Sequence, residues 1–354
     1  MTALRAALVT PLSGPLAIYG LAGAAALAVW AERAAELPRR WTRVELDVLD
    51  AYPKAAAATR AAVARRPDVI FGPYGSGPAV AALGATDELV WNHGGATDRL
   101  AWPRFRHTLN VPAPASTYFA RVLEAVRASA ATGSAVVLLH GATGFGREVA
   151  RGALEAAARL GFDVQAYEFA AGEALTAAGK LPPGEVLLVA GSFADELAVA
   201  SVVLDRPWLA AAFVGAGVDE VLAPLSATRE GLLGPCQWLP DERASLDEGP
   251  DTDWFVREFR AAAGTDPPYP AAAAFAAGVL CGRCLRDAGT TESLALLTIA
   301  QRLDVRTLFG RFRLDPRTGV QVGHQVLVVQ WQQGMRHVVW PPARAERPLM
   351  LRAV

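Results

Sequence analysis

Short runs rich in Val, Leu and Ile alternate with Ala-rich segments along most of this chain. Apolar runs of this length, bounded by Gly and Pro, are typical of buried strands, and their alternation with helical segments predicts parallel sheets covered by helices. Long helices are expected at residues 16–36 and 55–65. The first series of strands is expected at residues 6–10, 44–49, 68–72 and 89–92.

A second series begins after a proline-rich segment at residues 111–116. Its strands are expected at residues 135–140, 164–169, 185–190, 211–215 and 231–238. Two later helices, at residues 253–263 and 271–288, have no new sheet of their own and are expected to return to the first one. The chain is expected to close with strands at residues 310–314, 325–331 and 336–340.

This order predicts an α/β fold with two Rossmann-like lobes joined by a three-segment hinge. The chain is expected to cross between the lobes near Pro112, Pro240 and Gly323. The first lobe then comprises residues 1–112 plus 241–322, and the second comprises residues 113–240 plus 323–354. Because open α/β sheets bind ligands at the carboxyl ends of their strands, the ligand cleft is expected between the lobes.

Composition narrows the functional class. The chain has 354 residues, 52% of them hydrophobic and 19% charged, with a formal net charge of −1. This balance excludes an intrinsically disordered protein and supports about two domains. It also supplies no general attraction to a polyanion, so no nucleic-acid partner is expected.

The N-terminal segment after Arg5 is apolar up to Trp30. Residues 11–15 contain two prolines and a glycine, which neither a signal peptide nor a membrane-spanning helix would contain in its apolar core. This segment therefore predicts a strand, a turn and a helix in a soluble protein.

Three cysteines are present, Cys236 alone and Cys281 with Cys284 in an apolar, helical run. Two cysteines do not complete a four-ligand zinc site, and the five histidines are scattered. We therefore expect the cysteines to be small core residues, with no metal ion and no cofactor.

Three loops at expected strand ends of the first lobe combine glycine with small hydroxyl residues and tyrosine, at residues 13–19, 74–77 and 94–97. Such loops let backbone N–H groups approach an anion at a helix N-terminus, so they indicate a carboxylate site. Several aromatic residues lie in or beside the strand-end loops of both lobes and could wall a small-molecule pocket, whereas Trp91 is expected in the core. The remaining aromatic candidates are Tyr19, Tyr74, Phe145 and Phe193.

The loop at residues 141–146 by itself resembles the phosphate loop of an NADP-dependent reductase. However, Arg147 stands where the third glycine should fall, and the loop opens the second series of strands. His93 and His107 have no Gly-x-Ser-x-Gly motif or reactive cysteine with them, so no enzyme activity is expected. The acidic pairs 195–196 and 219–220 are interpreted first as helix caps.

Taken in order, several motifs resemble type I periplasmic solute-binding proteins of ABC transporters, of the Leu/Ile/Val-binding class. The resemblance covers essentially the whole chain, although each motif alone is weak. The motifs are Pro-Leu-Ser-Gly-Pro-Leu-Ala-Ile-Tyr-Gly at 11–20, Phe-Gly-Pro-Tyr-Gly-Ser at 71–76, Gly-Gly-Ala-Thr at 94–97, Gly-Phe-Gly-Arg at 144–147, Pro-Tyr-Pro at 268–270 and Leu-Val-Val-Gln-Trp at 327–331.

The resemblance implies a solute-binding component of an ABC importer, with a membrane permease as its partner and an amino acid, amide or organic acid as its ligand. It implies that Ser76 and the loop formed by Gly95, Ala96 and Thr97 hold the ligand carboxylate. Tyr19 would wall the pocket from the first lobe, and Phe145 and Phe193 would do so from the second.

One position departs from the pattern of the amino-acid binders. Gly217 stands where they carry an acidic partner for the ligand ammonium, and Asp219 is the substitute candidate. If Asp219 does not serve, the ligand is expected to lack an α-ammonium group.

The first expected strand begins within a few residues of Met1, so this chain lacks a signal peptide. We expect that one was removed and that the protein is periplasmic or extracellular. Two alternatives stay open, a cytoplasmic amide or amino-acid sensor on the same fold and the NADP-dependent reductase.

Overall fold

The computed structural model describes residues 2–33, 37–38, 40–102, 104–129, 135–218, 221–241 and 245–352. The chain divides into two compact units. The first unit comprises Met1–Pro114 and Trp238–Gln325, and the second comprises Ala115–Gln237 and Val326–Val354. These three boundaries lie two or three residues from the crossing points expected at 112, 240 and 322.

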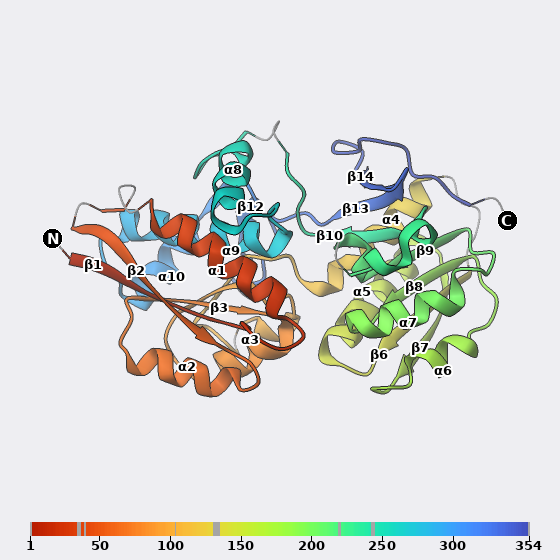
Figure 1. The fold of residues 1–354 in the computed structure, drawn as a ribbon, viewed down its shortest axis with the longest axis horizontal. Helices are drawn as coiled ribbons and strands as arrows, with labels where there is room; N and C mark the ends of the chain where they lie inside the picture. The colour runs from red at the N-terminus through yellow and green to blue at the C-terminus, as the bar shows by residue number, and fades with distance from the viewer. Residues whose placement is uncertain are drawn as a thin grey trace. The chain divides into compact units, whose positions relative to one another are not determined.

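A parallel sheet forms the centre of the first unit (Figure 1). It has five strands in the order β2-β1-β3-β4-β5. Helix α1 lies on one face of the sheet and α2 and α3 lie on the other (Figure 1), as the right-handed crossovers usual for parallel strands require. The strands are β1 (Thr2–Thr10), β2 (Trp41–Asp50), β3 (Val69–Tyr74), β4 (Val90–Gly94) and β5 (Thr108–Asn110). The helices between them are α1 (Ala17–Ala31), α2 (Ala55–Ala64) and α3 (Ser76–Leu83).

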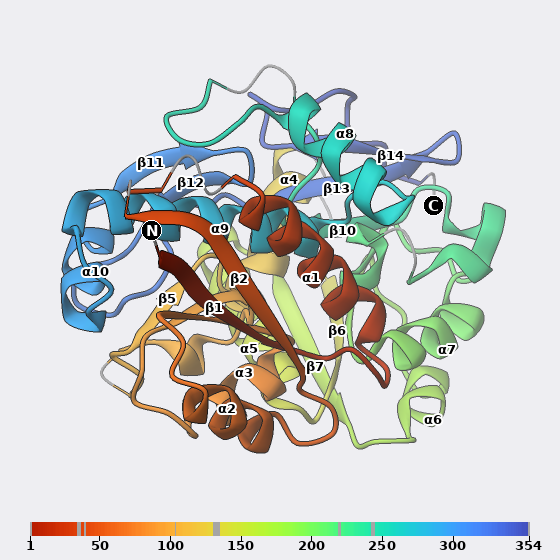
Figure 2. The same cartoon turned by 60° about the vertical axis from the view of Figure 1, so that its left-hand side comes forward.

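Helices from late in the sequence complete the first unit. Helix α8 (Thr252–Ala263) and helix α9 (Tyr269–Ala288) pack beside α1, and α10 (Ser293–Ala300) packs against α9 (Figure 2). Small residues allow this close approach, because a Cβ at Gly278 of α9 would lie 2.5 Å from the ring of Trp30. The prediction that the two late helices return to the first sheet is confirmed. A two-stranded sheet follows, β11 (Asp304–Thr307) with β12 (Gly310–Arg313).

The sheet of the second unit has the order β14-β13-β10-β9-β8-β6-β7, with the last two strands of the chain added antiparallel at one edge. Helices α4 and α5 pack together, and so do α6 and α7. The strands are β6 (Ala135–Gly141), β7 (Asp163–Phe169), β8 (Val186–Ala190), β9 (Ala210–Phe213), β10 (Leu233–Cys236), β13 (Leu327–Gln332) and β14 (Met335–Trp340). The helices are α4 (Tyr118–Ala128), α5 (Gly144–Leu160), α6 (Ala174–Gly179) and α7 (Phe193–Val203).

The α/β prediction with parallel sheets is therefore confirmed, as is the strand, turn and helix at the N-terminus. The structure ends α1 at Ala31, before the expected end at residue 36, which lies outside the described residues. The strand expected at 211–215 stops at Phe213, because a 3₁₀ turn (Val214–Gly217) follows at once. Three short elements were not predicted, namely β5, α10 and β11.

The apolar core of the first unit lies between the sheet and helices α1, α8 and α9. Trp91 is fully buried there, as expected. Cys281 and Cys284 are buried in α9 and Cys236 is buried in β10, and none of them is in a disulfide, which confirms that they are core residues. Burial raises the pKa of Cys284 to about 12, so this thiol stays protonated.

His93 is the exception in this core. Its ring is fully buried beside Gly23 of α1, and neither ring nitrogen has a hydrogen-bond partner among the described residues. Burial lowers the pKa of His93 to about 4, so the imidazole is neutral at pH 7. His107, the other histidine considered, has its Nε2 3.1 Å from the carbonyl oxygen of Leu83.

Within the described part of the chain, no helix is long and apolar enough to cross a bilayer. The same residues contain no group of three or more His, Cys, Asp or Glu side chains placed to hold a metal ion.

Candidate functional site

Two of the three loops expected to bind an anion meet at the carboxyl edge of the first sheet. The backbone N–H of Gly75 donates to the carbonyl oxygen of Gly94 over 3.0 Å. A Cβ at Gly95 would lie 2.5 Å from the Cβ of Ala79 in α3. The loop at 74–77 and the loop at 94–97 are thus in direct contact, and Gly94 must be glycine because a Cβ there would lie 2.5 Å from the Cα of Tyr74.

Strand order explains why this edge is a candidate ligand site. In this sheet β2 lies on one side of β1, and β3 and the later strands lie on the other side. The strand order therefore reverses between β1 and β3. Crevices at such a point, outside the carboxyl ends of the strands, are the usual ligand sites of open α/β sheets. Ser76 follows β3 directly, as the first residue of α3.

Helix α3 begins without a side-chain cap. Its N-cap residue is Gly75, at φ 96°, and Ser76 and Gly77 form its first turn. The first N–H groups of a helix have no partner within the helix and carry a partial positive charge, so they favour an anion. Ser76 is half-buried and adds a hydroxyl donor at the same place.

The third expected loop, residues 13–19, is tied to the end of β2 through Ser13 and contacts the 74–77 loop through Tyr19, whose ring lies beside that of Tyr74. The Ser13 hydroxyl donates to Asp50 over 2.6 Å, and the N–H groups of Leu12 and Tyr52 donate to the same carboxylate. These hydrogen bonds, that of Ser13 foremost, lower the pKa of Asp50. Ser13 therefore has a structural partner in this loop.

Tyr19 and Tyr74 form an aromatic cluster in the first unit. Both are at least 95% buried, and their ring centroids lie 4.8 Å apart. The hydroxyl of Tyr74 lies 2.7 Å from that of Tyr269, the first residue of α9. The structure thus adds Tyr269 to the two tyrosines singled out from the sequence.

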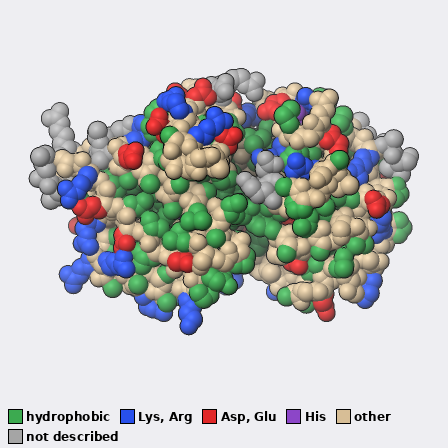
Figure 3. Space-filling view, viewed as in Figure 1, with side chains coloured by type: hydrophobic (Ala, Val, Ile, Leu, Met, Phe, Trp, Pro, Cys, Tyr) green, Lys and Arg blue, Asp and Glu red, His purple; other side chains and the backbone are tan. Residues whose placement is uncertain are grey.

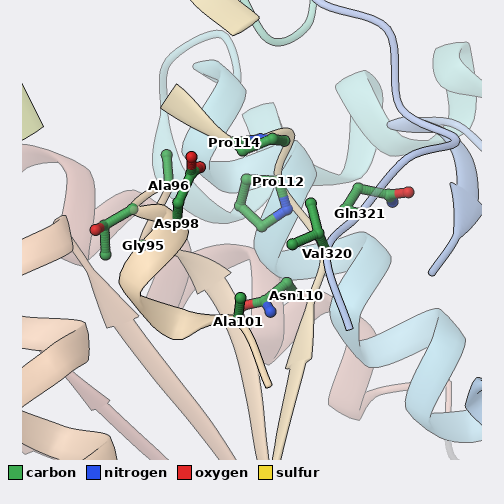
Figure 4. Close-up of a pocket in the computed structure, with 10 residues that line it drawn as sticks. Gly95, Ala96, Asp98, Ala101, Asn110, Pro112, Pro114, Val320 and Gln321 are labelled. Carbon is green, nitrogen blue, oxygen red and sulfur yellow. The ribbon is translucent and has the colours of Figure 1, made fainter. Parts of the chain in front are cut away.

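Gly95, Ala96 and Thr97 border a small hollow together with Asp98, Asn110 and Gln321 (Figure 4). Thr97 is 5% exposed, and its hydroxyl accepts the N–H of Arg99, which starts a short 3₁₀ helix, Asp98–Leu100. The hollow measures about 10 Å³, the room of a single water molecule.

A second, apolar hollow of about 470 Å³ lies beside the 74–77 loop in the first unit. Its lining includes Leu16, Tyr52, Gly77 and Pro78. Hydrophobic side chains are visible on the surface of this unit in Figure 3, and Ile18, Leu21 and Tyr52 are about half exposed.

Phe145 and Phe193 come from neighbouring strand ends in the second unit. They lie in the first turns of α5 and α7, which follow β6 and β8, the strands at the reversal point of this sheet. Both side chains are half-buried, and Phe145 packs edge-on against Tyr118 with 6.0 Å between ring centroids. The two candidates therefore share one sheet edge.

The helix starts on this edge are capped by the chain itself. The Thr143 hydroxyl accepts the N–H of Gly146 at the start of α5, and Arg147 pairs with Glu168 through two hydrogen bonds. At α7, Ser192 and Asp195 form a capping box, which confirms the capping role expected for Asp195. The donors at these two helix starts are thus partly satisfied internally, and this weakens the case for a phosphate at 141–146.

Glu196, interpreted from sequence as a second cap, has a different role. It is fully buried, and its carboxylate accepts the N–H of Gly191 after β8 and of Gly215 after β9, over 3.2 and 2.6 Å. Burial raises the pKa of Glu196 to about 8 against the effect of these hydrogen bonds. One carboxyl group therefore holds the loops after β8 and β9 together.

The structure explains the departure at Gly217. A Cβ there would lie 1.9 Å from the carbonyl oxygen of Pro235 in β10, and the carbonyl of Gly217 accepts from Arg336 over 2.7 Å. No side chain fits at this position, so no acidic group can stand there. Asp219 and Glu220, the other candidates, lie outside the described residues.

Comparison with known proteins gives one consistent result. A family model described as periplasmic binding protein matches residues 3–336. Comparison with curated proteins finds no match.

Many solved structures share the fold at low sequence identity. A solute-binding protein of an ABC transporter from R. palustris, in complex with benzoate, is 17% identical with a TM-score of 0.79, over 96% of each chain. The leucine-binding protein LivK from Thermotoga maritima is 16% identical with a TM-score of 0.81, over 95% of this chain and 97% of LivK. LivJ from Streptococcus pneumoniae, in complex with isoleucine, is 16% identical with a TM-score of 0.79, over 96% of this chain and all of LivJ.

Proposed function

The chain belongs to the periplasmic binding protein family, of type I and the Leu/Ile/Val-binding class, and we propose that it binds a small carboxylate as the solute-binding component of an ABC importer. The observation that carries this proposal is the contact between the loops at 74–77 and 94–97. There an uncapped helix start, the Ser76 hydroxyl and glycine backbone offer donors suited to a carboxylate. We assign the ligand contacts on this side to Ser76, Gly95, Ala96 and Thr97.

The aromatic candidates supply the apolar part of the proposed site. Phe145 and Phe193 are half-buried on the second unit, next to helix starts that are already capped. Such a surface suits an apolar ligand body better than a second anion. Tyr19 and Tyr74 are buried against each other, so their proposed role is to support the pocket wall of the first unit.

The first ligand candidate is an organic acid without an α-ammonium group, such as an aromatic acid. Gly217 carries no side chain and has no room for one, so the acidic partner expected of an amino-acid binder is missing at that position. A structural neighbour in complex with benzoate makes this acid the natural first probe. An amino acid is the second candidate, with Asp219 as the partner of its ammonium group.

Isothermal titration calorimetry tests the proposal with benzoate, 3,4-dihydroxybenzoate, isoleucine, leucine and the uncharged analogue benzamide. We expect saturable binding of benzoate and at least about tenfold weaker binding of benzamide, because the amide lacks the carboxylate charge. No saturable binding of any of these compounds would refute the proposal.

Asp219→Asn separates the two ligand candidates. Binding of benzoate should be unchanged in this variant if the ligand has no ammonium group. If isoleucine is the better ligand and Asp219→Asn weakens it by about tenfold or more, the amino-acid assignment replaces ours. Ser201→Ala, an exposed serine within α7, is the matched control and should change neither affinity.

The proposed partner is the membrane permease of the importer, and the proposed location is periplasmic or extracellular. Fractionation of cells that express the full gene should recover the protein outside the cytoplasm. Recovery in the cytoplasm together with a regulatory protein would support the sensor alternative. The reductase alternative predicts binding of NADPH at millimolar concentration, which calorimetry measures directly.

A further inference from the structure

A single buried side chain fixes the conformation of the proposed carboxylate loop. Asn92 of β4 is fully buried, and its side-chain carbonyl accepts the N–H of Gly95 over 2.8 Å. Its side-chain amide donates to the carbonyl oxygen of the same glycine over 2.7 Å. Both backbone polar groups of Gly95 are thus held by one asparagine, so the peptide planes on either side of Gly95 have a fixed direction.

The second N–H of the Asn92 amide continues to the neighbouring strand. It donates to the side-chain oxygen of Asn110 over 2.9 Å, and the two residues are register partners in β4 and β5. The amide of Asn110, 7% exposed, donates in turn to the carbonyl oxygen of Gly319 over 3.2 Å. All the donors and acceptors of Asn92 are therefore used inside the first unit.

Gln321 holds the residue that follows Asn110 in the chain. Its amide donates to the carbonyl oxygen of Val111 over 3.2 Å, and its carbonyl accepts the N–H of Gly323 over 2.8 Å. Gln321 is 3% exposed and borders the small hollow opposite Gly95 and Ala96 (Figure 4). The network therefore joins the 94–97 loop to the two segments by which the chain leaves the first unit, after Pro114 and after Gln325.

We infer that Asn92 and Asn110 are positioning residues for the ligand: they aim the backbone of the 94–97 loop at the carboxylate and anchor that loop to the exit segments of the first unit. The inference rests on the proposed function. Neither asparagine touches the ligand in this assignment, because the side-chain polar atoms of both are occupied by hydrogen bonds and Asn92 is completely buried. An apolar residue at 92 would release both polar groups of Gly95.

The test measures benzoate affinity of the full chain by calorimetry, or isoleucine affinity if only the amino acid binds. Asn92→Ala should weaken binding by about tenfold or more, since it removes several hydrogen bonds that hold the loop. Asn110→Ala should weaken it by about threefold, since Asn92 still holds Gly95. The double variant should bind like Asn92→Ala alone, because Asn110 acts through Asn92.

Thr108→Val is the matched control. Thr108 is a buried residue of β5 on the same face as Asn110, and its hydroxyl has no hydrogen-bond partner among the described residues. This variant should keep wild-type affinity. If Asn92→Ala does not fold, Asn110→Ala and Gln321→Ala carry the test on the same terms.

Amide hydrogen exchange in the protein without added ligand gives a readout independent of binding. The amide of Gly95 should exchange faster in Asn92→Ala and in Asn110→Ala than in the wild type and in Thr108→Val. Wild-type affinity in a folded Asn92→Ala variant, losses that add in the double variant, or unchanged exchange at Gly95 would each overturn the inference. A wild type that binds none of the compounds would instead refute the proposed function.

Discussion

The two sheets have the same topology at the carboxyl-terminal ends of their strands, here called their carboxyl edges. The backbone polar groups at these two edges find their hydrogen-bond partners differently. In the first unit, α1 and α3 begin without side-chain caps, and neutral amides hold the loops. In the second unit, α5 and α7 begin with their own caps, and a buried carboxylate holds the loops. Backbone donors are thus left for an anion on one edge and largely used on the other.

This difference assigns distinct roles to edges that the strand order alone makes equivalent. The first edge offers backbone donors to an anion, and the second presents half-buried aromatic side chains. It also separates their response to pH, because amides do not titrate and a buried carboxylate does. Each of the following predictions tests one side of this comparison against the other.

The largest effect is expected from the pH dependence of Glu196. Its pKa of about 8 in the folded protein lies above its usual value, so the native state binds more protons than the unfolded state between these values. The stabilisation that comes from protonated Glu196 is therefore fully present in acid and is lost as the pH rises toward 8. The free energy of unfolding should fall by on the order of 3 kcal/mol between pH 5 and pH 8. Urea unfolding of wild type and Glu196→Gln at several pH values measures this loss.

Glu196→Gln should abolish the loss of stability at alkaline pH. It should also remove one of the two hydrogen bonds from the loops, since an amide nitrogen cannot accept an N–H. In the wild type, protection from amide hydrogen exchange should fall at alkaline pH within residues 191–217 and should not change in the 94–97 loop. If the free energy of unfolding falls with pH equally steeply in wild type and variant, Glu196 does not distinguish the two edges.

A smaller effect is expected from glycines at the two edges. Gly217→Ala should lower the free energy of unfolding by about 2 kcal/mol, because its Cβ would meet the carbonyl oxygen of Pro235 at 1.9 Å. Gly77→Ala in α3 should raise it by about 0.5 kcal/mol, because nothing lies within 4 Å of the added Cβ. Thermal unfolding measures both, and a tolerated Gly217→Ala would undo our explanation of the missing acidic residue.

The smallest change in stability is expected from hydroxyls at the two helix starts. Thr143→Ala should cost about 1 kcal/mol through the lost cap of α5 and should leave benzoate affinity unchanged. Ser76→Ala should change stability by less than about 0.5 kcal/mol and weaken benzoate binding by about tenfold. Unfolding measures the stability of both variants, and calorimetry measures their benzoate affinity. Weaker benzoate binding in Thr143→Ala with wild-type binding in Ser76→Ala would contradict the assignment of the anion to the first edge.

Much of the fold could be predicted from the sequence, because buried parallel strands are continuous apolar runs. The run at 68–72 differs from β3 by one residue at its start and two at its end, and the run at 185–190 differs from β8 by one residue at its start. By contrast, β5 has three residues and includes Thr108 and Asn110, so it has no apolar run of its own. Its place is set by pairing with β4.

The proposed site could be predicted only in part. Glycine loops with hydroxyl residues identify the 74–77 and 94–97 loops by local composition. Asn92 was overlooked, although a single amide within the apolar run at 89–92 was a usable signal. Its role depends on Asn110, 18 residues away, and on Gly319, which no local pattern connects to it.

Glu196 shows the same limit in the second unit. At the start of a helix it resembles a cap, and only the fold brings the N–H of Gly215 to its carboxylate. Likewise the need for glycine at 217 comes from β10, eighteen positions further along the chain. Long-range backbone contacts of this kind leave no periodic signal in the sequence.

The late arrival of α9 in the first unit has a consequence for how the protein is made. The face of the first sheet that carries Phe71 and Trp91 is covered by a helix that the ribosome synthesises only after β6 to β10. Until residue 288 has emerged, α1 can pack on this apolar face but the part covered by α8 and α9 is exposed, and the second unit likewise lacks β13 and β14. Neither unit can therefore finish folding during most of translation, so the chain depends on protection from aggregation until its last third is complete.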